Sequence, residues 1–159
     1  MAIVVAAETP LQDDVRRLIG ELNTTLLALT PSEFCFHMTA EQMAQPDTTV
    51  FLAREDGVAV ACGALRRHPE VTGEIKRMYT LPSHQGRGIG GRILEEIEAV
   101  ARNEGFARLV LETGHRHPAA WRVYERAGFT RCGRVLDYPD SEYSVFYEKA
   151  LAAGSERAP

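Results

Sequence analysis

The sequence predicts one α/β domain in which helices flank a mixed sheet. With 159 residues, 45% hydrophobic and 25% charged, the chain has the length and balance of a single globular core. Segments with helical spacing of apolar residues alternate with short strand-like runs, which predicts the order β-α-ββ-β-α-β-α-β-β. No repeat or linker divides the chain. We therefore expect one domain over residues 1–151 and a small, polar, flexible tail at residues 152–159.

The elements follow from the spacing of apolar residues. Runs rich in β-branched and aromatic residues predict strands at residues 3–6, 50–54, 58–65, 74–81, 109–111, 129–136 and 143–151. Apolar residues at helical spacing predict helices at residues 11–29, 89–101 and 118–127. Thr9 is the expected cap of the first helix, and Thr39 is the expected cap of an additional short helix. Asp56-Gly57 predicts a hairpin between the second and third strands.

Composition and charge narrow the classes of partner. A net charge of -4 and a pI of about 5.7 argue against nucleic-acid binding, which needs a basic face, and slightly favour a cationic amine substrate. No apolar run approaches the ~20 residues of a membrane span, and the first residues lack the basic start of a signal peptide. The three cysteines have no metal-ligand spacing and fit small buried side chains in a reducing compartment. We therefore expect a cytoplasmic protein with no nucleic-acid or membrane partner.

A glycine-rich segment links a predicted strand to a predicted helix: Gln85-Gly86-Arg87-Gly88-Ile89-Gly90-Gly91. Such a loop leaves its backbone N–H groups open to a ligand, and the start of the following helix suits a phosphate or pyrophosphate. Arg87 and Arg92 add positive charge. The alternative is a turn without a ligand, which would not explain why the chain accepts the conformational entropy that several glycines lose on folding.

The same segment also satisfies a dinucleotide fingerprint. Gly86, Gly88 and Gly91 have the spacing G-x-G-x-x-G, and Glu112 lies near the distance at which an acid would hold a ribose hydroxyl. Two features argue against a nicotinamide-dependent oxidoreductase. Residues 81–85 separate the strand from the first glycine, and too little chain follows Glu112 for the remaining strands and a substrate domain.

Three segments together resemble the GCN5-related N-acetyltransferase (GNAT) superfamily. Gln85-x-x-Gly88-x-Gly90 resembles its pyrophosphate-binding signature, Gln/Arg-x-x-Gly-x-Gly/Ala. Residues 74–82, EIKRMYTLP, resemble its fourth strand, and residues 119–129, AAWRVYERAGF, resemble its second signature, a helix with a tyrosine before a closing Gly-Phe. The segments occur in order and at the family's spacing over roughly residues 74–129. The resemblance implies a mixed, mostly antiparallel central sheet flanked by helices.

The resemblance also implies acetyl-CoA as co-substrate. The pyrophosphate is expected on the backbone amides of residues 87–91 and the pantetheine arm along the fourth strand, around Met78 and Thr80. Most members have valine in place of Thr80, and the second signature often begins with asparagine where this chain has His117, which can still donate to a carbonyl. The implied cofactor-binding residues are Met78, Tyr79, Thr80, Gln85, Gly86, Arg87, Gly88, Ile89, Gly90, Gly91, His117 and Tyr124.

The resemblance further implies catalytic residues. Tyr124 matches the tyrosine that many members use as general acid toward the CoA sulfur; the alternative is a packed aromatic. Glu74 stands where histone acetyltransferases of the family place their general base; the alternative is a solvated or ion-paired carboxylate. Glu112 is a second candidate for the base, or a group that binds a cationic substrate. His115 and His117 suggest a metal site, but no carboxylate or thiol cluster supports one, so no metal is expected.

The expected function is transfer of an acetyl group from acetyl-CoA to a primary amine of a small molecule or peptide by direct attack. Two alternatives stay open: a non-catalytic sensor that binds acyl-CoA without turnover, and the nicotinamide-dependent oxidoreductase. A homodimer is common in the family and is an open possibility here. The segments expected to select the acceptor, residues 11–46 and 137–144, carry no motif that identifies it.

Overall fold

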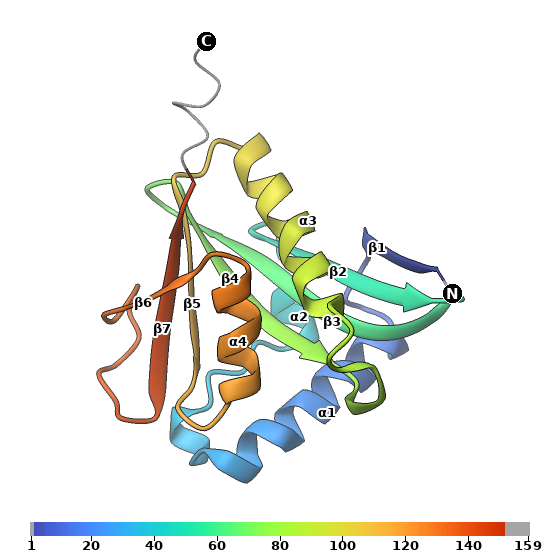
Figure 1. Cartoon of the computed structure of the whole chain (residues 1–159), viewed down its shortest axis with the longest axis horizontal. Coiled ribbons are helices and arrows are strands. Elements are labelled where there is room, and N and C mark those ends of the chain that lie inside the picture. Colours follow the sequence, from blue (N-terminus) through green and yellow to red (C-terminus); the bar gives the residue numbers. More distant parts are fainter. Residues whose placement is uncertain (1, 152–159) are drawn as a thin grey trace.

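The computed structural model describes residues 2–151, so the tail predicted at residues 152–159 lies outside the described residues. The described chain forms a seven-stranded sheet with helices on both faces (Figure 1). The strands are β1 (Ile3–Ala7), β2 (Thr48–Glu55), β3 (Val58–His68), β4 (Thr72–Thr80), β5 (Arg108–Gly114), β6 (Thr130–Cys132) and β7 (Ser144–Ala150). The helices are α1 (Asp13–Leu29), α2 (Ala40–Met43), α3 (Ile89–Asn103) and α4 (Pro118–Arg126), with short 3-10 turns at Ser32–Phe34 and Pro82–His84.

The sheet opens between two of its inner strands. The strand order is β1-β2-β3-β4-β5-β7-β6, and neighbours run antiparallel except for β4 and β5, so the predicted mixed, mostly antiparallel sheet is confirmed. The parallel ladder begins at Thr72 and ends where Ile75 pairs with Leu111. β4 continues to Thr80 and β5 to Gly114 without further pairing between them. The two strands therefore separate toward their carboxyl ends.

Two hydrophobic clusters hold the helices to opposite faces of the sheet (Figure 1). On one face, Ile93 and Ile97 of α3 belong to a cluster with Leu109 of β5 and with inward residues of α4. On the other face, Leu18 of α1 lies in a cluster with Leu52 of β2 and with residues of α2. The helical spacing expected for residues 89–101 is thus confirmed as the buried stripe of α3.

The segment between β6 and β7 differs from the prediction. The strand expected at residues 129–136 pairs only over Thr130–Cys132, because β6 is an edge strand and the chain then leaves the sheet. Residues 133–143 fold over the sheet instead. There Val135 is buried with Val110 and Phe146 in a third cluster, and Tyr138 packs against it. This segment brings Tyr138 over β4.

One predicted helix cap is confirmed and one is wrong. At α2, the Gln42 N–H donates to Thr39 Oγ1 while the Thr39 N–H donates to Gln42 Oε1, which forms a reciprocal capping box. α1 begins only at Asp13. Thr9 does not cap it, because the Thr9 hydroxyl accepts a hydrogen bond from the Leu11 N–H in a turn that precedes the helix.

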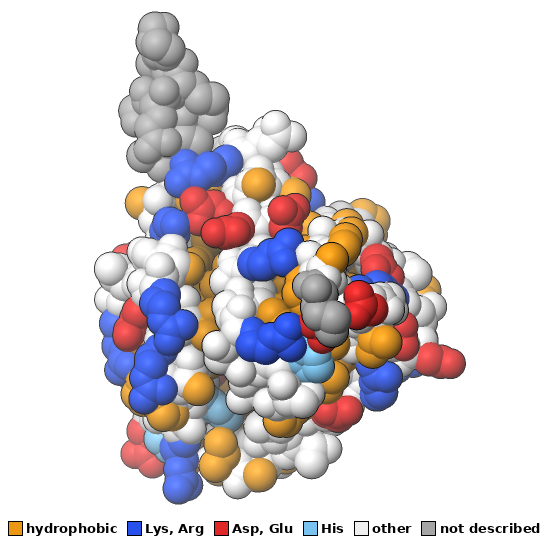
Figure 2. All heavy atoms as spheres, turned by 45° about the vertical axis from the view of Figure 1, so that its right-hand side comes forward, with side chains coloured by type: hydrophobic (Ala, Val, Ile, Leu, Met, Phe, Trp, Pro, Cys, Tyr) orange, Lys and Arg blue, Asp and Glu red, His pale blue; other side chains and the backbone are white. Residues whose placement is uncertain are grey.

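The surface mixes charges of both signs. Figure 2 shows basic and acidic side chains interspersed on one face, with hydrophobic side chains exposed between them. In residues 2–151, no helix is both long enough and apolar enough to cross a membrane. Cys62 is buried as expected, whereas Cys35 and Cys132 are only half-buried, and all three are free thiols.

Candidate active site

The glycine-rich segment forms the turn that starts α3. Gly88 is the N-cap residue, with φ of 77°, and Gly86 has φ of 79°; both lie in the left-handed region that favours glycine. No side chain of the described residues caps α3, so the N–H groups of its first turn remain available as donors. Together with the positive end of the helix dipole, these donors make the turn suited to an anion.

Two contacts hold this turn in place. Gln85 Nε2 donates to the Thr80 carbonyl at 3.1 Å and closes the connection from β4. Glu55, at the end of β2, accepts a hydrogen bond from Arg87 Nη2 at 2.7 Å and lies 2.9 Å from His84 Nε2. The hydrogen bonds from Arg87 and His84 lower the pKa of the Glu55 carboxyl. The Arg87 side chain is thereby held toward Glu55 of β2.

The turn borders a cleft of about 1280 Å³ that also involves α1, β4 and α4. A volume above the ~300–1,000 Å³ typical of drug-sized ligands suits an extended molecule. Every predicted cofactor-binding residue except Arg87 lines it: Met78, Tyr79, Thr80, Gln85, Gly86, Gly88, Ile89, Gly90, Gly91, His117 and Tyr124.

Sequence reasoning missed three cations of this cleft. Arg116, Arg122 and Arg126 line it, and none forms an ion pair with a described residue. Arg122 and Arg126 are spaced i,i+4 on α4 and therefore lie on one side of that helix. Unpaired guanidinium groups suit phosphate oxygens. The sequence contains a signal for two of them, because Arg122 and Arg126 have i,i+4 spacing within residues 119–129, the segment that resembles the second signature.

A β-bulge in β4 decides which side chains face each side of the sheet. β3 has only Gly63 opposite Arg77 and Met78. Arg77 has φ of 57°, an uncommon value for a residue other than glycine. Because of the extra residue, Met78 packs in the cluster of α3, whereas Arg77 reaches the opposite face and bonds to α1.

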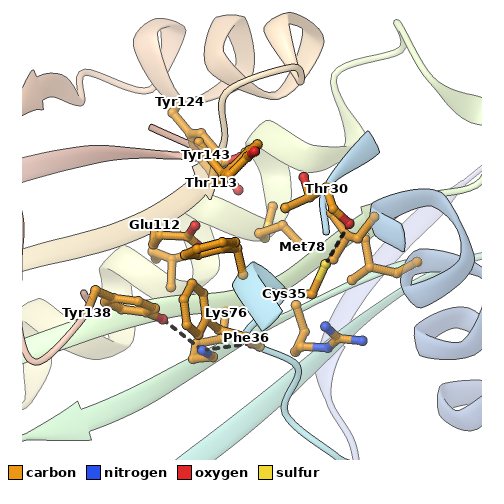
Figure 3. Close-up of a pocket in the computed structure, with 16 residues that line it drawn as sticks. Thr30, Cys35, Phe36, Lys76, Met78, Glu112, Thr113, Tyr124, Tyr138 and Tyr143 are labelled. Carbon is orange, nitrogen blue, oxygen red and sulfur yellow. Dashed lines mark hydrogen bonds between the residues drawn. The ribbon is translucent and has the colours of Figure 1, made fainter. Parts of the chain in front are cut away.

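A small cavity of about 90 Å³ lies where β4 and β5 separate (Figure 3). Two aromatic pairs line it: Phe34 with Tyr143, at 4.9 Å between ring centroids, and Phe36 with Tyr138, at 5.1 Å. Polar groups in the wall include Cys35, Lys76, Arg77, Glu112 and Thr113. The cavity and the cleft share Leu22, Leu26, Met78 and Tyr124, so the two spaces meet at these residues.

Tyr124 lies at this junction. α4 directs it inward, with 7% of the residue exposed and its ring centroid 6.1 Å from Phe129 and 6.0 Å from Tyr147. Its hydroxyl has no hydrogen-bond partner among the described residues. Burial, together with the charge of Glu112, raises the pKa of Tyr124, so the hydroxyl is protonated at neutral pH. Tyr124 is thus a packed aromatic with a protonated hydroxyl at the junction, and its role as general acid stays a prediction.

Glu112 lies on β5 immediately after the last parallel pair, and it lines the cavity. Its Oε2 accepts a hydrogen bond from the Ser144 hydroxyl at 2.7 Å. Burial is the main cause that raises the pKa of Glu112 above that of an ordinary glutamate, although the Ser144 hydrogen bond and the Lys76 charge oppose it. A carboxyl group with a raised pKa in a cavity wall is suited to accept a proton.

Glu74 has a different environment. It is 2% exposed and is absent from the cavity wall. The Tyr138 hydroxyl donates to its Oε2, and His68 Nε2 lies 2.8 Å from its Oε1. Lys76 Nζ lies 3.6 Å from Oε2 and donates to the Tyr138 hydroxyl at 2.9 Å (Figure 3). Glu74 is therefore an ion-paired carboxylate that contacts the cavity only through Tyr138 and Lys76, and its role as base stays a prediction.

His117 precedes α4 at the N-cap position and lines the cleft, but its side chain forms no capping hydrogen bond. Its Nε2 is buried without a hydrogen-bond partner among the described residues. Burial, followed by the nearby His115, lowers the pKa of His117, so a neutral imidazole faces the cleft at neutral pH. Within residues 2–151, no group of three or more His, Cys, Asp or Glu side chains is arranged to hold a metal ion.

The sequence matches known acetyltransferases over most of its length. The acetyltransferase (GNAT) family matches residues 19–129. The IAA acetyltransferase of Azospirillum brasilense is 39% identical over 150 residues, which cover 94% of this chain and 98% of that relative. The uncharacterized N-acetyltransferase YsnE of Bacillus subtilis is 33% identical over 136 residues, which cover 84% of this chain and 90% of YsnE.

Solved structures share the fold. A candidate acyl-CoA N-acyltransferase from Klebsiella pneumoniae is similar with a TM-score of 0.80 at 30% identity, over 94% of this chain and 97% of that one. The PaiA N-acetyltransferase of Thermoplasma acidophilum, solved in complex with coenzyme A, has the same fold with a TM-score of 0.69 at 17% identity, over 95% of this chain and 100% of that one. The family match and the near full-length relatives show that the chain belongs to the acetyltransferase (GNAT) family.

Proposed function

We propose that the protein is an N-acetyltransferase that transfers an acetyl group from acetyl-CoA to a primary amine of a small molecule or peptide. The observation that carries this proposal is the continuity of three parts: the anion-binding turn of α3, the stretch of β4 beyond Ile75, and Tyr124 where the cleft meets the cavity. In that order they fit a pyrophosphate, an extended pantetheine arm and a thioester. The cavity beyond Tyr124 is assigned to the amine.

The edge of β4 fits the pantetheine arm. Residues after Ile75 pair with β3 on one side and are unpaired with β5 on the other. An extended arm that contains amides can bond to such a backbone edge as an added strand does. Arg116, Arg122 and Arg126 supply positive charge in the cleft for the phosphate groups.

The chemistry requires a neutral amine and a proton for the leaving sulfur. The amine nitrogen forms a C–N bond with the acetyl carbonyl carbon while the C–S bond breaks. Glu112, which faces the cavity, accepts the proton that the amine loses. Tyr124 donates the proton that converts the leaving thiolate to a thiol. Glu74 is less suited to the base role because Tyr138 and Lys76 stand between it and the cavity.

A thiol-release assay with acetyl-CoA tests the proposal. The acceptor panel contains amino acids, polyamines, aminoglycosides, aryl amines and basic peptides, together with IAA because the Azospirillum relative carries that name. Release of one thiol for each acetylated amine is the expected result. Calorimetry with CoA and NADH distinguishes the failures. A protein that binds CoA but acetylates no amine is a sensor, and one that binds NADH but not CoA is no acetyltransferase.

A further inference from the structure

Arg77 is a buried cation that forms no ion pair with a described residue. Arg77 is 7% exposed, and its Nη2 donates both of its hydrogen bonds, one to the Ile19 carbonyl and one to Asn23 Oδ1. Its Nε is buried and has no hydrogen-bond partner among the described residues. Burying a guanidinium without an anion is costly, and proteins retain such exceptions mainly at functional positions.

Arg77 lines the small cavity and, unlike the other cation there, Lys76, has no carboxylate partner among the described residues. Lys76 already has a carboxylate, because Glu74 Oε2 lies 3.6 Å from its Nζ. Glu112 also lines the cavity, accepts a hydrogen bond from Ser144, and has no cation of the described residues within ion-pair distance. The cavity wall thus contains one guanidinium and one carboxylate that form an ion pair neither with each other nor with another described residue.

We propose that the acceptor is a small amino acid, whose amine is held at Glu112 and whose carboxylate is held at Arg77. The proposal rests on the acetyltransferase function proposed above. A guanidinium presents N–H donors in a planar arrangement that matches a carboxylate, and Nη1 is the donor available here because it has no hydrogen-bond partner among the described residues and, unlike Nε, is not fully buried. A polyamine would instead bring a second positive charge toward Arg77.

The dimensions of the cavity agree with a small acceptor. A volume of about 90 Å³ holds several water-sized groups, which is room for an amino-acid headgroup. The rings of Phe34 and Tyr143 form an apolar part of the wall, which fits an uncharged side chain on the acceptor.

Matched pairs of amino acids and their carboxamides test the carboxylate contact. Alanine and alaninamide, and leucine and leucinamide, have the same amine and similar size, but only the acids carry the negative charge. We expect kcat/KM for each acid to exceed that for its amide by ~30-fold or more, as for loss of one partner of a buried charge pair. Amine basicity would favour the amides, because their less basic amines are more often neutral, so it cannot produce this preference.

Two variants separate recognition from structural support. Arg77→Met keeps an apolar stem of similar length and removes the charge, and it should reduce the acid-to-amide ratio to near one, mainly through KM of the acids. Asn23→Ala removes a hydrogen bond between α1 and Arg77 but leaves the guanidinium, and it should keep the ratio. A ratio that survives in Arg77→Met, or an equal loss of acid and amide activity in that variant, would overturn the proposal.

A binding measurement does not depend on turnover. In the presence of CoA, N-acetylalanine should raise the Tm of the wild-type protein more than N-acetylalaninamide does, and Arg77→Met should abolish the difference. Equal shifts in the wild type overturn the amino-acid assignment even if other amines are acetylated. In that case thiol release with those amines still supports the acetyltransferase function.

Discussion

Replacing Gly88 by aspartate tests whether the turn before α3 binds the pyrophosphate, and Gly88→Asn separates charge from shape. A Cβ at Gly88 would meet no atom of a described residue within 4 Å apart from its chain neighbours, so the first side-chain atom has space in the free protein. The φ of 77° costs ~1–2 kcal/mol for most residues but less for Asn and Asp, which adopt this conformation more readily. An aspartate at the helix start regains ~0.3–1 kcal/mol from the dipole. We therefore expect nearly equal Tm values for the two variants.

CoA affinity should separate them. A carboxylate ~4 Å from a unit negative charge loses about 1 kcal/mol in water and about 4 kcal/mol at an effective dielectric constant of ~20. A pyrophosphate with roughly two charges then raises the loss for Gly88→Asp to ~2–8 kcal/mol, which is ~30-fold in Kd up to undetectable binding. Gly88→Asn should lose only the part of the CoA binding free energy that depends on the space that the side chain occupies, because asparagine carries no charge. In the aspartate variant, added salt should restore part of the affinity by screening.

Isothermal titration calorimetry with CoA, supported by thermal melts, decides the outcome. Unchanged affinity in Gly88→Asp would refute the assignment of the turn. Equal losses in Gly88→Asp and Gly88→Asn would also count against it, because the loss would then reflect shape rather than repulsion of a phosphate charge.

Four further substitutions address catalysis and stability. Tyr124→Phe keeps the ring and removes the proton donor, so steady-state kinetics should show kcat reduced by ~10²–10⁴ with KM for acetyl-CoA nearly unchanged; a normal kcat would leave Tyr124 only its packing role. Because the pKa of Glu112 is raised, kcat/KM should fall as pH drops through that raised value. Glu112→Gln should remove this acidic limb and lower kcat, and its activity should partly recover at high pH, where the amine is already neutral. If only Glu74→Gln changes the pH dependence of kcat/KM, the base is Glu74 instead. The raised pKa also means that ionised Glu112 costs stability once pH exceeds its folded-state pKa, so Glu112→Gln should not lower Tm at pH 7. Thr39→Ala removes half of the α2 capping box and should cost ~1 kcal/mol in urea unfolding with CoA affinity retained; an unchanged midpoint would show that the cap contributes nothing.

Features that depend on neighbouring residues were predictable from the sequence. The turn before α3 requires a positive φ at Gly88, and the glycine that permits it is part of the segment itself. The capping box of α2 likewise needs only Thr39 and Gln42. Thr9 shows the limit of this reasoning, because the same hydroxyl that can cap a helix can also close a turn before it.

Features that depend on the tertiary structure were missed. The bulge sends Arg77 to the α1 face, although strict alternation along β4 would place it with Ile75 against α3. A signal existed, since the apolar residues Ile75, Met78 and Leu81 do not follow a period of two. Tyr138 had no such signal, because its position over β4 depends on residues 133–143 leaving the sheet at an edge strand.

The choice between Glu74 and Glu112 depends on where the parallel ladder ends, which local patterns do not specify. Glu74 pairs with Val110 inside the ladder, whereas Glu112 lies beyond its last pair. The closed part of the sheet buries Glu74 beneath Tyr138, and the open part exposes Glu112 to the cavity. For Glu74 to receive a proton from the amine, Tyr138 would have to give up the proton that it already donates to Glu74 and accept another. As the proposed base, Glu112 would accept the proton without an intermediary, and this difference in path favours it over Glu74.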